Sequence, residues 1–238
     1  MRKFTVKRAF PYKRAALYLL VAAGMALLNF ALPQREPLAF ALYFAALGCG
    51  LNAIFCAGSY IVASAAALSS AATLVCTIQA VFLTLVFFLY RRLGHKVKLE
   101  RTAYCALCQL PFIFLYPHTG YALLPLPVTA QRAIIAAFLF LLSMLFEGGL
   151  HALLQRAFRC RLGASELTEL AVCWLFLGLG LTGALGSSAF SLVALSALLF
   201  SVVVTKNAAC VPFAAVLSLP LCVSRASALP LAEYAVYA

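Results

Sequence analysis

A run of 53 residues without a charged side chain, at positions 38–90, constrains this chain more than any other feature. One helix of that length would extend about 80 Å, far more than the thickness of a bilayer. Small or polar residues interrupt the apolar pattern at Gly48, Gly50, Asn52 and Gly58, and again at Ser69–Ser70. The run therefore predicts three helices, at 38–51, 53–68 and 71–90. The middle one is rich in Ala and Ser, which favours close packing or a re-entrant insertion.

The composition indicates that the bilayer acts as solvent for this fold. Hydrophobic residues make up 66% of the chain and charged residues 10%, and the mean hydropathy is +1.04. A soluble domain carries about 25% charged residues. Because backbone groups in hydrocarbon must pair within the protein, spans are helices or strands of a closed barrel. The apolar runs are long and do not alternate with period two, so we predict an all-α, polytopic transmembrane helical bundle.

Cations gather in short segments beside the apolar runs. Residues 1–14 carry six Lys and Arg, 91–101 carry five, and 156–161 carry three. Positive charge of this kind marks the cytoplasmic side of membrane proteins, so we place all three segments inside. It also accounts for the net charge of +12 without a nucleic-acid partner. Anionic lipid headgroups are the expected counterions.

These observations predict a basic cytoplasmic N-terminus at 1–14 and a multi-span membrane domain at 15–238. The expected spans are 15–32, 38–51, 53–68, 71–90, 102–116, 133–154, 167–185, 190–205 and 208–223, with a partial tenth at 229–238. The segment 117–131 carries three prolines and is expected to be an external loop. Because the last ten residues amount to half a crossing, we expect the protein to continue beyond Ala238.

Motifs for soluble chemistry are weak here. The GxGxxG match at Gly178–Gly183 lies in an apolar helix without a preceding strand, so we interpret it as close helix packing. The chain has no Asp, which removes Asp-based metal sites and Asp-bearing triads. Its single CxxC, Cys105–Cys108, has no second ligand pair. We therefore predict no catalytic residue, no metal site and no cofactor.

The candidate polar site is Glu147 with His151, four residues apart on one helical face. An intramembrane acid with a His neighbour can form a proton relay. The alternative, which we favour, is that both side chains reach the cytoplasmic interface near Arg156. Isolated polar residues elsewhere predict interhelical hydrogen bonds, namely Asn29, Asn52, Gln79 and Gln109.

Three stretches resemble the membrane-embedded N-terminal region of the stage II sporulation protein E family. The first is Pro37–Leu47, which precedes a short helix of small residues. The second is the Arg91–Arg92 loop after a span rich in Phe and Leu. The third runs from Ala164 through Leu177–Gly183 to Phe190.

This resemblance implies a sporulating bacterium, a location in its cytoplasmic membrane at the division septum, and contacts with septal proteins. In that family a cytoplasmic PP2C-type Ser/Thr phosphatase domain follows the membrane region and acts on an anti-sigma-factor antagonist. The phosphatase needs Asp ligands, and this chain has none, so we predict that the chain itself is not an enzyme. The resemblance therefore implies that this chain serves in anchoring, localisation and self-association.

Two functions are therefore expected from the sequence. The first is a membrane anchoring and localisation module for a sporulation signalling protein. The second is a small-solute transporter or the membrane subunit of one, for which the many spans, the broken run 48–58 and the Glu147–His151 pair argue.

The predicted orientation has a direct test in intact cells. A Lys96→Cys variant should resist a membrane-impermeant maleimide, because residue 96 lies in a segment that we place inside. A cysteine introduced at Thr119, in the segment 117–131, serves as the exposed control. Equal labelling of the two variants would refute the orientation.

Overall fold

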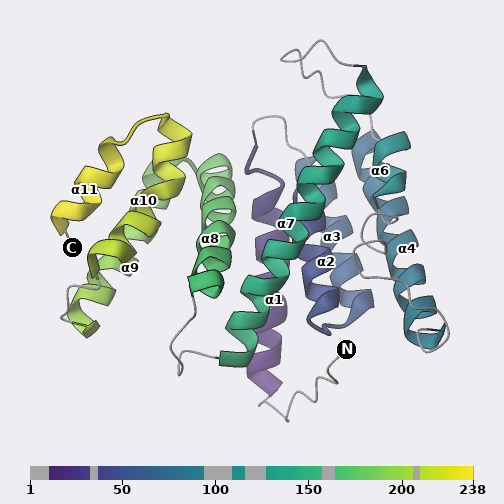
Figure 1. Ribbon diagram of the computed structural model, residues 1–238, viewed down its shortest axis with the longest axis horizontal. Coiled ribbons are helices and arrows are strands. Elements are labelled where there is room, and N and C mark those ends of the chain that lie inside the picture. The colour runs from purple at the N-terminus through teal and green to yellow at the C-terminus, as the bar shows by residue number, and fades with distance from the viewer. Residues whose placement is uncertain are drawn as a thin grey trace.

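The computed structural model describes residues 11–32, 37–93, 109–115, 127–156, 164–205 and 210–237. Every regular element in these ranges is an α-helix, which confirms the predicted all-α fold over this part of the chain (Figure 1). The helices are α1 (Pro11–Leu28), α2 (Ala39–Gly48), α3 (Ala53–Ala67), α4 (Ser70–Leu93), α6 (Leu110–Leu115), α7 (Val128–Arg156), α8 (Ala164–Leu185), α9 (Ser187–Thr205), α10 (Cys210–Arg225) and α11 (Leu229–Tyr237).

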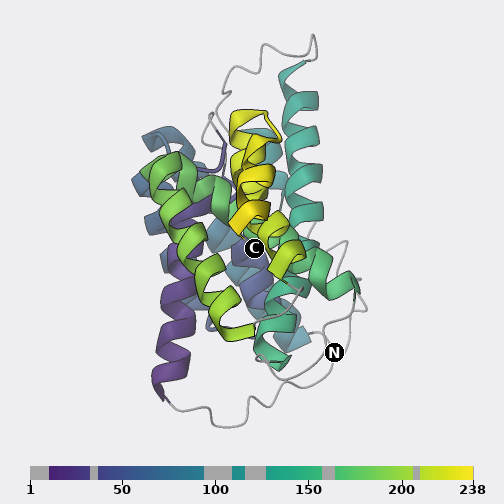
Figure 2. The same cartoon turned by 90° about the vertical axis from the view of Figure 1, so that its left-hand side faces the viewer.

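The helices form two groups that meet along α8. In Figure 1, α8 to α11 lie on the left, and the remaining helices lie on the right. Figure 2 views the bundle from the side of α9, α10 and α11. Helix α8 packs against α1 and α7 of the larger group and against α10 of the smaller one. Each group has a core of its own, and α8 joins the two.

Three helices are long and apolar enough to cross a bilayer. Their apolar parts are Ser70–Leu89, Val128–Leu153 and Ser165–Leu185. Five shorter apolar helices accompany them, in α1, α2, α3, α9 and α10. The lengths and composition agree with a membrane protein.

The predicted breaks in the uncharged run are confirmed. Helix α2 ends at Gly48, α3 occupies Ala53–Ala67, and α4 begins at Ser70. The predicted loop 117–131 is wrong at its C-terminal end, because α7 already begins at Val128. There the Pro127 carbonyl accepts from the backbone N–H groups of Ala130 and Gln131 and so starts the helix. Of the expected span 102–116, the described residues contain only α6 and the turn before it.

Helix α2 is buried on all sides. Every residue from Ala39 to Leu47 is buried, and the helix packs against α1, α3 and α7. A helix that is apolar all round belongs in the interior of a bundle, and four alanines let its neighbours approach closely. At ten residues it is about 15 Å long, which is half of the hydrocarbon thickness.

The C-terminal end of α2 is closed by a Schellman motif. The Leu51 N–H donates to the Ala46 carbonyl (3.1 Å), and the Gly50 N–H donates to the Leu47 carbonyl (3.0 Å). Gly50 has φ +81°, in the left-handed region that residues with a Cβ avoid. The glycine therefore satisfies the last carbonyls of the buried helix and reverses the chain toward α3.

The cation-rich ends of the helices gather at one end of the bundle. Helix α1 begins, and α4 and α7 end, at the lower end in Figure 1. These helix ends adjoin the segments 1–14, 91–101 and 156–161 in the sequence. The common placement agrees with the charge pattern that a membrane domain requires.

A Gly50→Ala substitution should destabilise the protein by about 1–2 kcal/mol, because the new Cβ raises the energy of the left-handed backbone. A clash is not the cause, since no atom lies within 4 Å of the added Cβ. Gly58→Ala is the matched control, because Gly58 also has open space but lies inside α3. There Ala should stabilise by up to about 1 kcal/mol through helix propensity. Denaturation of the detergent-solubilised protein by SDS measures both, and a shift of the same sign for the two variants would contradict the assignment.

Candidate functional site

Two fully buried tyrosines stack where α2 meets α3. The rings of Tyr43 and Tyr60 have centroids 5.2 Å apart and planes inclined by 12°. Phe40 contacts both rings edge-on, at 6.4 Å from Tyr43 and 6.3 Å from Tyr60. A buried phenol needs a hydrogen-bond partner, so the two hydroxyl groups determine which polar residues surround the stack.

The Tyr43 hydroxyl reaches from α2 to α4. It lies 2.7 Å from the Thr84 hydroxyl and donates to the Ala80 carbonyl at 3.2 Å. The Thr84 hydroxyl also donates to the Ala80 carbonyl, at 2.7 Å. One backbone carbonyl of α4 thus accepts from two side chains, and α2 is tied to α4 across the core.

The Tyr60 hydroxyl starts a second chain of hydrogen bonds, which we call the amide network and define as Tyr60, Gln79 and Gln109. Tyr60 donates to Gln79 Oε1 at 3.1 Å, and Gln79 Nε2 donates to Gln109 Oε1 at 3.4 Å. Gln79 is 0% and Gln109 2% exposed. The residues belong to α3, α4 and the turn before α6, so the predicted interhelical hydrogen bonds of Gln79 and Gln109 are confirmed.

Two polar atoms in this region have no hydrogen-bond partner. Within the described part of the chain, Gln109 Nε2 and Ser64 Oγ are buried and make no hydrogen bond. Ser64 is on α3, one turn beyond Tyr60. A buried donor left unpaired costs about 1–3 kcal/mol. Gln109 Nε2 therefore favours any small molecule that brings an acceptor into the amide network.

The two asparagines that were predicted to bond between helices differ in their roles. Asn29 Oδ1 accepts from the Ala39 N–H at 3.2 Å, so it links the end of α1 to the start of α2. Asn52 instead caps its own helix, because its Oδ1 accepts from the Ile54 N–H at 3.0 Å. The prediction for the Asn52 side chain is wrong for this reason: an Asn just before a helix preferentially binds the free N–H groups of that helix.

Glu147 and His151 are both half-buried on α7. The Cys49 thiol, just after α2, donates to the Glu147 backbone carbonyl at 3.8 Å. Glu169 of α8 lies directly against Gly148, where any side chain would collide with its carboxylate. The structure therefore adds Glu169 to the surroundings of the predicted pair. The proton relay and the interfacial position both stay predictions.

Metal-ligating side chains do not converge in the described residues. No group of three or more His, Cys, Asp or Glu residues there has the geometry to hold a metal ion. Cys105 and Cys108 lie outside the described residues.

The glycines of the GxGxxG match are packing residues, as predicted. A side chain at Gly180 would collide with the Leu27 carbonyl, and one at Gly183 with the Phe30 carbonyl. Both carbonyls belong to the end of α1 and the turn that follows it. The close approach of backbones explains why glycine is needed.

Sequence reasoning missed the tyrosine pair. Tyrosine in a membrane protein is typical of the interface, and nothing in the sequence near Tyr43 or Tyr60 marks them as central. The available signal was the presence of Gln79 on a neighbouring uncharged helix, because a buried amide requires a polar partner.

The comparisons with known proteins yielded no match: no protein-family model, no curated protein and no solved structure is similar to this chain.

A Gln79→Leu substitution should destabilise the protein by about 1–3 kcal/mol, because it removes the buried hydrogen bonds that Gln79 makes with Tyr60 and with Gln109. Tyr60→Phe removes only the hydroxyl from the same bond. We therefore expect the double variant to be less destabilised than the sum of the two, with a coupling of at least about 0.5 kcal/mol in SDS denaturation. Strict additivity would show that the two residues do not interact.

Proposed function

We propose that this chain is a membrane domain that binds a small, uncharged polar solute at the amide network, as part of a transporter. The observation that carries the proposal is the short helix α2, buried on all sides with polar side chains beside it. Membrane transporters build solute sites from short, discontinuous helices of this kind. Irregular backbone at membrane depth is tolerated where protein or a polar cavity surrounds it.

The chemistry of the network points to a neutral solute. Its side chains are a phenol and two primary amides, and none carries a charge. Gln109 Nε2 offers a free donor, which suits a carbonyl or hydroxyl oxygen. An ion would have to lose its hydration there without a counter-charge, at a high cost in free energy.

The number and direction of crossings belong to this proposal. We place nine spans and a partial tenth in a bacterial cytoplasmic membrane, with the N-terminus in the cytoplasm. The common end at which α1 begins and α4 and α7 end supports this orientation. Helix α2 is half the length of a full crossing, and this arrangement counts it as one of the nine spans.

Reconstituted liposomes test the proposed function. Urea, acetamide and glycerol serve as probes, and stopped-flow light scattering measures how quickly vesicles reswell after an osmotic step. Vesicles with the protein should admit at least one probe faster than protein-free vesicles. Gln109→Leu should reduce that permeability about tenfold, because it removes the free donor. Ser224→Ala, which changes an exposed residue at the end of α10, should not.

A second proposal is the anchoring module of a sporulation signalling protein, with septal proteins or further copies of the chain as partners. The apolar side chains exposed along α4, among them Leu74, Val81 and Leu85, support a surface that faces lipid or another helix. A fluorescent protein fused after Ala238 should then gather at division septa. Even fluorescence around the membrane, together with probe permeation that depends on Gln109, would exclude anchoring in favour of transport.

A further inference from the structure

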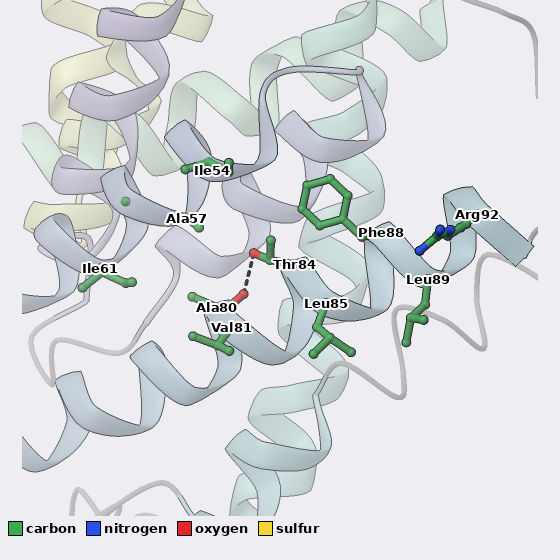
Figure 3. A pocket seen from close by; sticks show the side chains of 11 residues that line it. Ile54, Ala57, Ile61, Ala80, Val81, Thr84, Leu85, Phe88, Leu89 and Arg92 are labelled. Carbon is green, nitrogen blue, oxygen red and sulfur yellow. Dashed lines mark hydrogen bonds between the residues drawn. The ribbon is translucent and has the colours of Figure 1, made fainter.

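A groove of about 760 Å³ runs along the outer side of the bundle between α3 and α4 (Figure 3). We call it the α3–α4 groove. One wall comes from a single face of α3, and the other from α4. The wall residues that decide its character are Ile54, Ala57, Ile61, Leu85, Phe88 and Leu89. All are apolar, so the groove favours an aliphatic occupant.

The floor of the groove offers no competing polar group. It contains Ala80 and Thr84. The Thr84 hydroxyl is already bonded to the Ala80 carbonyl and to Tyr43, as the dashed line in Figure 3 shows in part. Water that enters such a channel finds few partners, and an alkyl chain that displaces it gains the hydrophobic contribution of each buried methylene.

A cation stands at one end of the groove. Arg92, in the last turn of α4, is exposed and is the one charged residue among the described residues that line the groove. It lies three residues beyond the end of the apolar stretch Ser70–Leu89. A guanidinium just beyond a membrane-length apolar stretch lies at the depth of lipid phosphates, and its planar donors suit a phosphate oxygen pair.

We propose that the α3–α4 groove is a binding site for an anionic glycerophospholipid, with one acyl chain between the helices and the phosphate at Arg92. Charge complementarity selects this occupant. An apolar helix of a partner would gain nothing from the arginine and would bury it at a cost. A zwitterionic lipid would bring its own cation next to the guanidinium, which opposes the phosphate contact. The site lies on the outer side of α4, so the proposal is independent of the solute proposed for the amide network.

Native mass spectrometry of the full chain, extracted in mild detergent, tests the headgroup requirement. The probes are phosphatidylglycerol and phosphatidylcholine with identical acyl chains, added in equal amounts. We expect the unaltered protein to retain phosphatidylglycerol preferentially. Arg92→Gln should reduce that retention about fivefold, as expected from the loss of one membrane-proximal cation. Arg225→Gln is the matched control, because it removes the same charge from an exposed position at the end of α10.

A second pair of variants tests the acyl-chain path. Ala57→Phe places a ring in the groove and should lower retention of phosphatidylglycerol, whereas Ala66→Phe, on the opposite, exposed face of the same helix, should not. Arg92→Lys should restore most of the binding lost in Arg92→Gln.

Four results would overturn the proposal. Equal retention of the two lipids by the unaltered protein would remove the headgroup contact. Equal effects of Arg92→Gln and Arg225→Gln on lipid retention would show that binding depends on the net charge of the protein and not on a site at Arg92. Equal effects of the two Phe variants would show that the lipid binds outside the groove. A dimer that Ala57→Phe abolishes and Arg92→Gln leaves intact would assign the groove to a second copy of the chain. Loss of probe permeation in Gln109→Leu with unchanged lipid retention would separate this site from the solute site.

Discussion

The fold depends on pairing the backbone polar groups at the two ends of α2, a helix whose residues are buried from Ala39 to Leu47. An unsatisfied backbone group in an apolar interior costs several kcal/mol. Helix α2 is therefore stable only if the backbone groups at both of its ends have hydrogen-bond partners. Asn29 supplies an acceptor at the first N–H, and the Schellman motif at Gly50 satisfies the last carbonyls. The side chains of α2 can then be apolar on every face, which lets α1, α3 and α7 pack directly around it.

The segment that closes α2 also joins the two halves of the bundle. Gly180 and Gly183 of α8 rest on the carbonyls of Leu27 and Phe30, on either side of Asn29. The turn that follows α1 therefore contacts the N-terminus of α2 on one side and α8, which leads to α9, α10 and α11, on the other. Close backbone contact needs the absence of Cβ atoms at both glycines, so this joint depends on sequence far from α2.

The sequence predicted the helices better than their relations. Gly50 and Ser69–Ser70 identify the breaks because glycine and serine interrupt apolar helices through local backbone conformation. That conformation depends on neighbouring residues in the sequence, so it can be predicted from them. The presence of Gln79 in an uncharged helix predicts a polar partner for its amide. It does not identify that partner as Tyr60, because the contact depends on how α3 and α4 pack. The same limit applied to Glu147, whose contact with Cys49 joins residues far apart in the chain. Neighbouring residues predict where helices begin and end. The candidate site is formed by contacts between residues far apart in the sequence, so it could not be predicted in this way.

The spacing of α3 and α4 sets both the groove on the outside and the amide network on the inside. Ile61 lines the groove, and the preceding residue, Tyr60, donates to the network. On α4, Ala80 lines the groove directly after Gln79. Adjacent residues on a helix point about 100° apart, so each helix directs one member toward the groove and the other toward the amide network. A wider gap between these helices would open the groove and stretch the Tyr60–Gln79 bond together, because both are measured across the same pair of backbones.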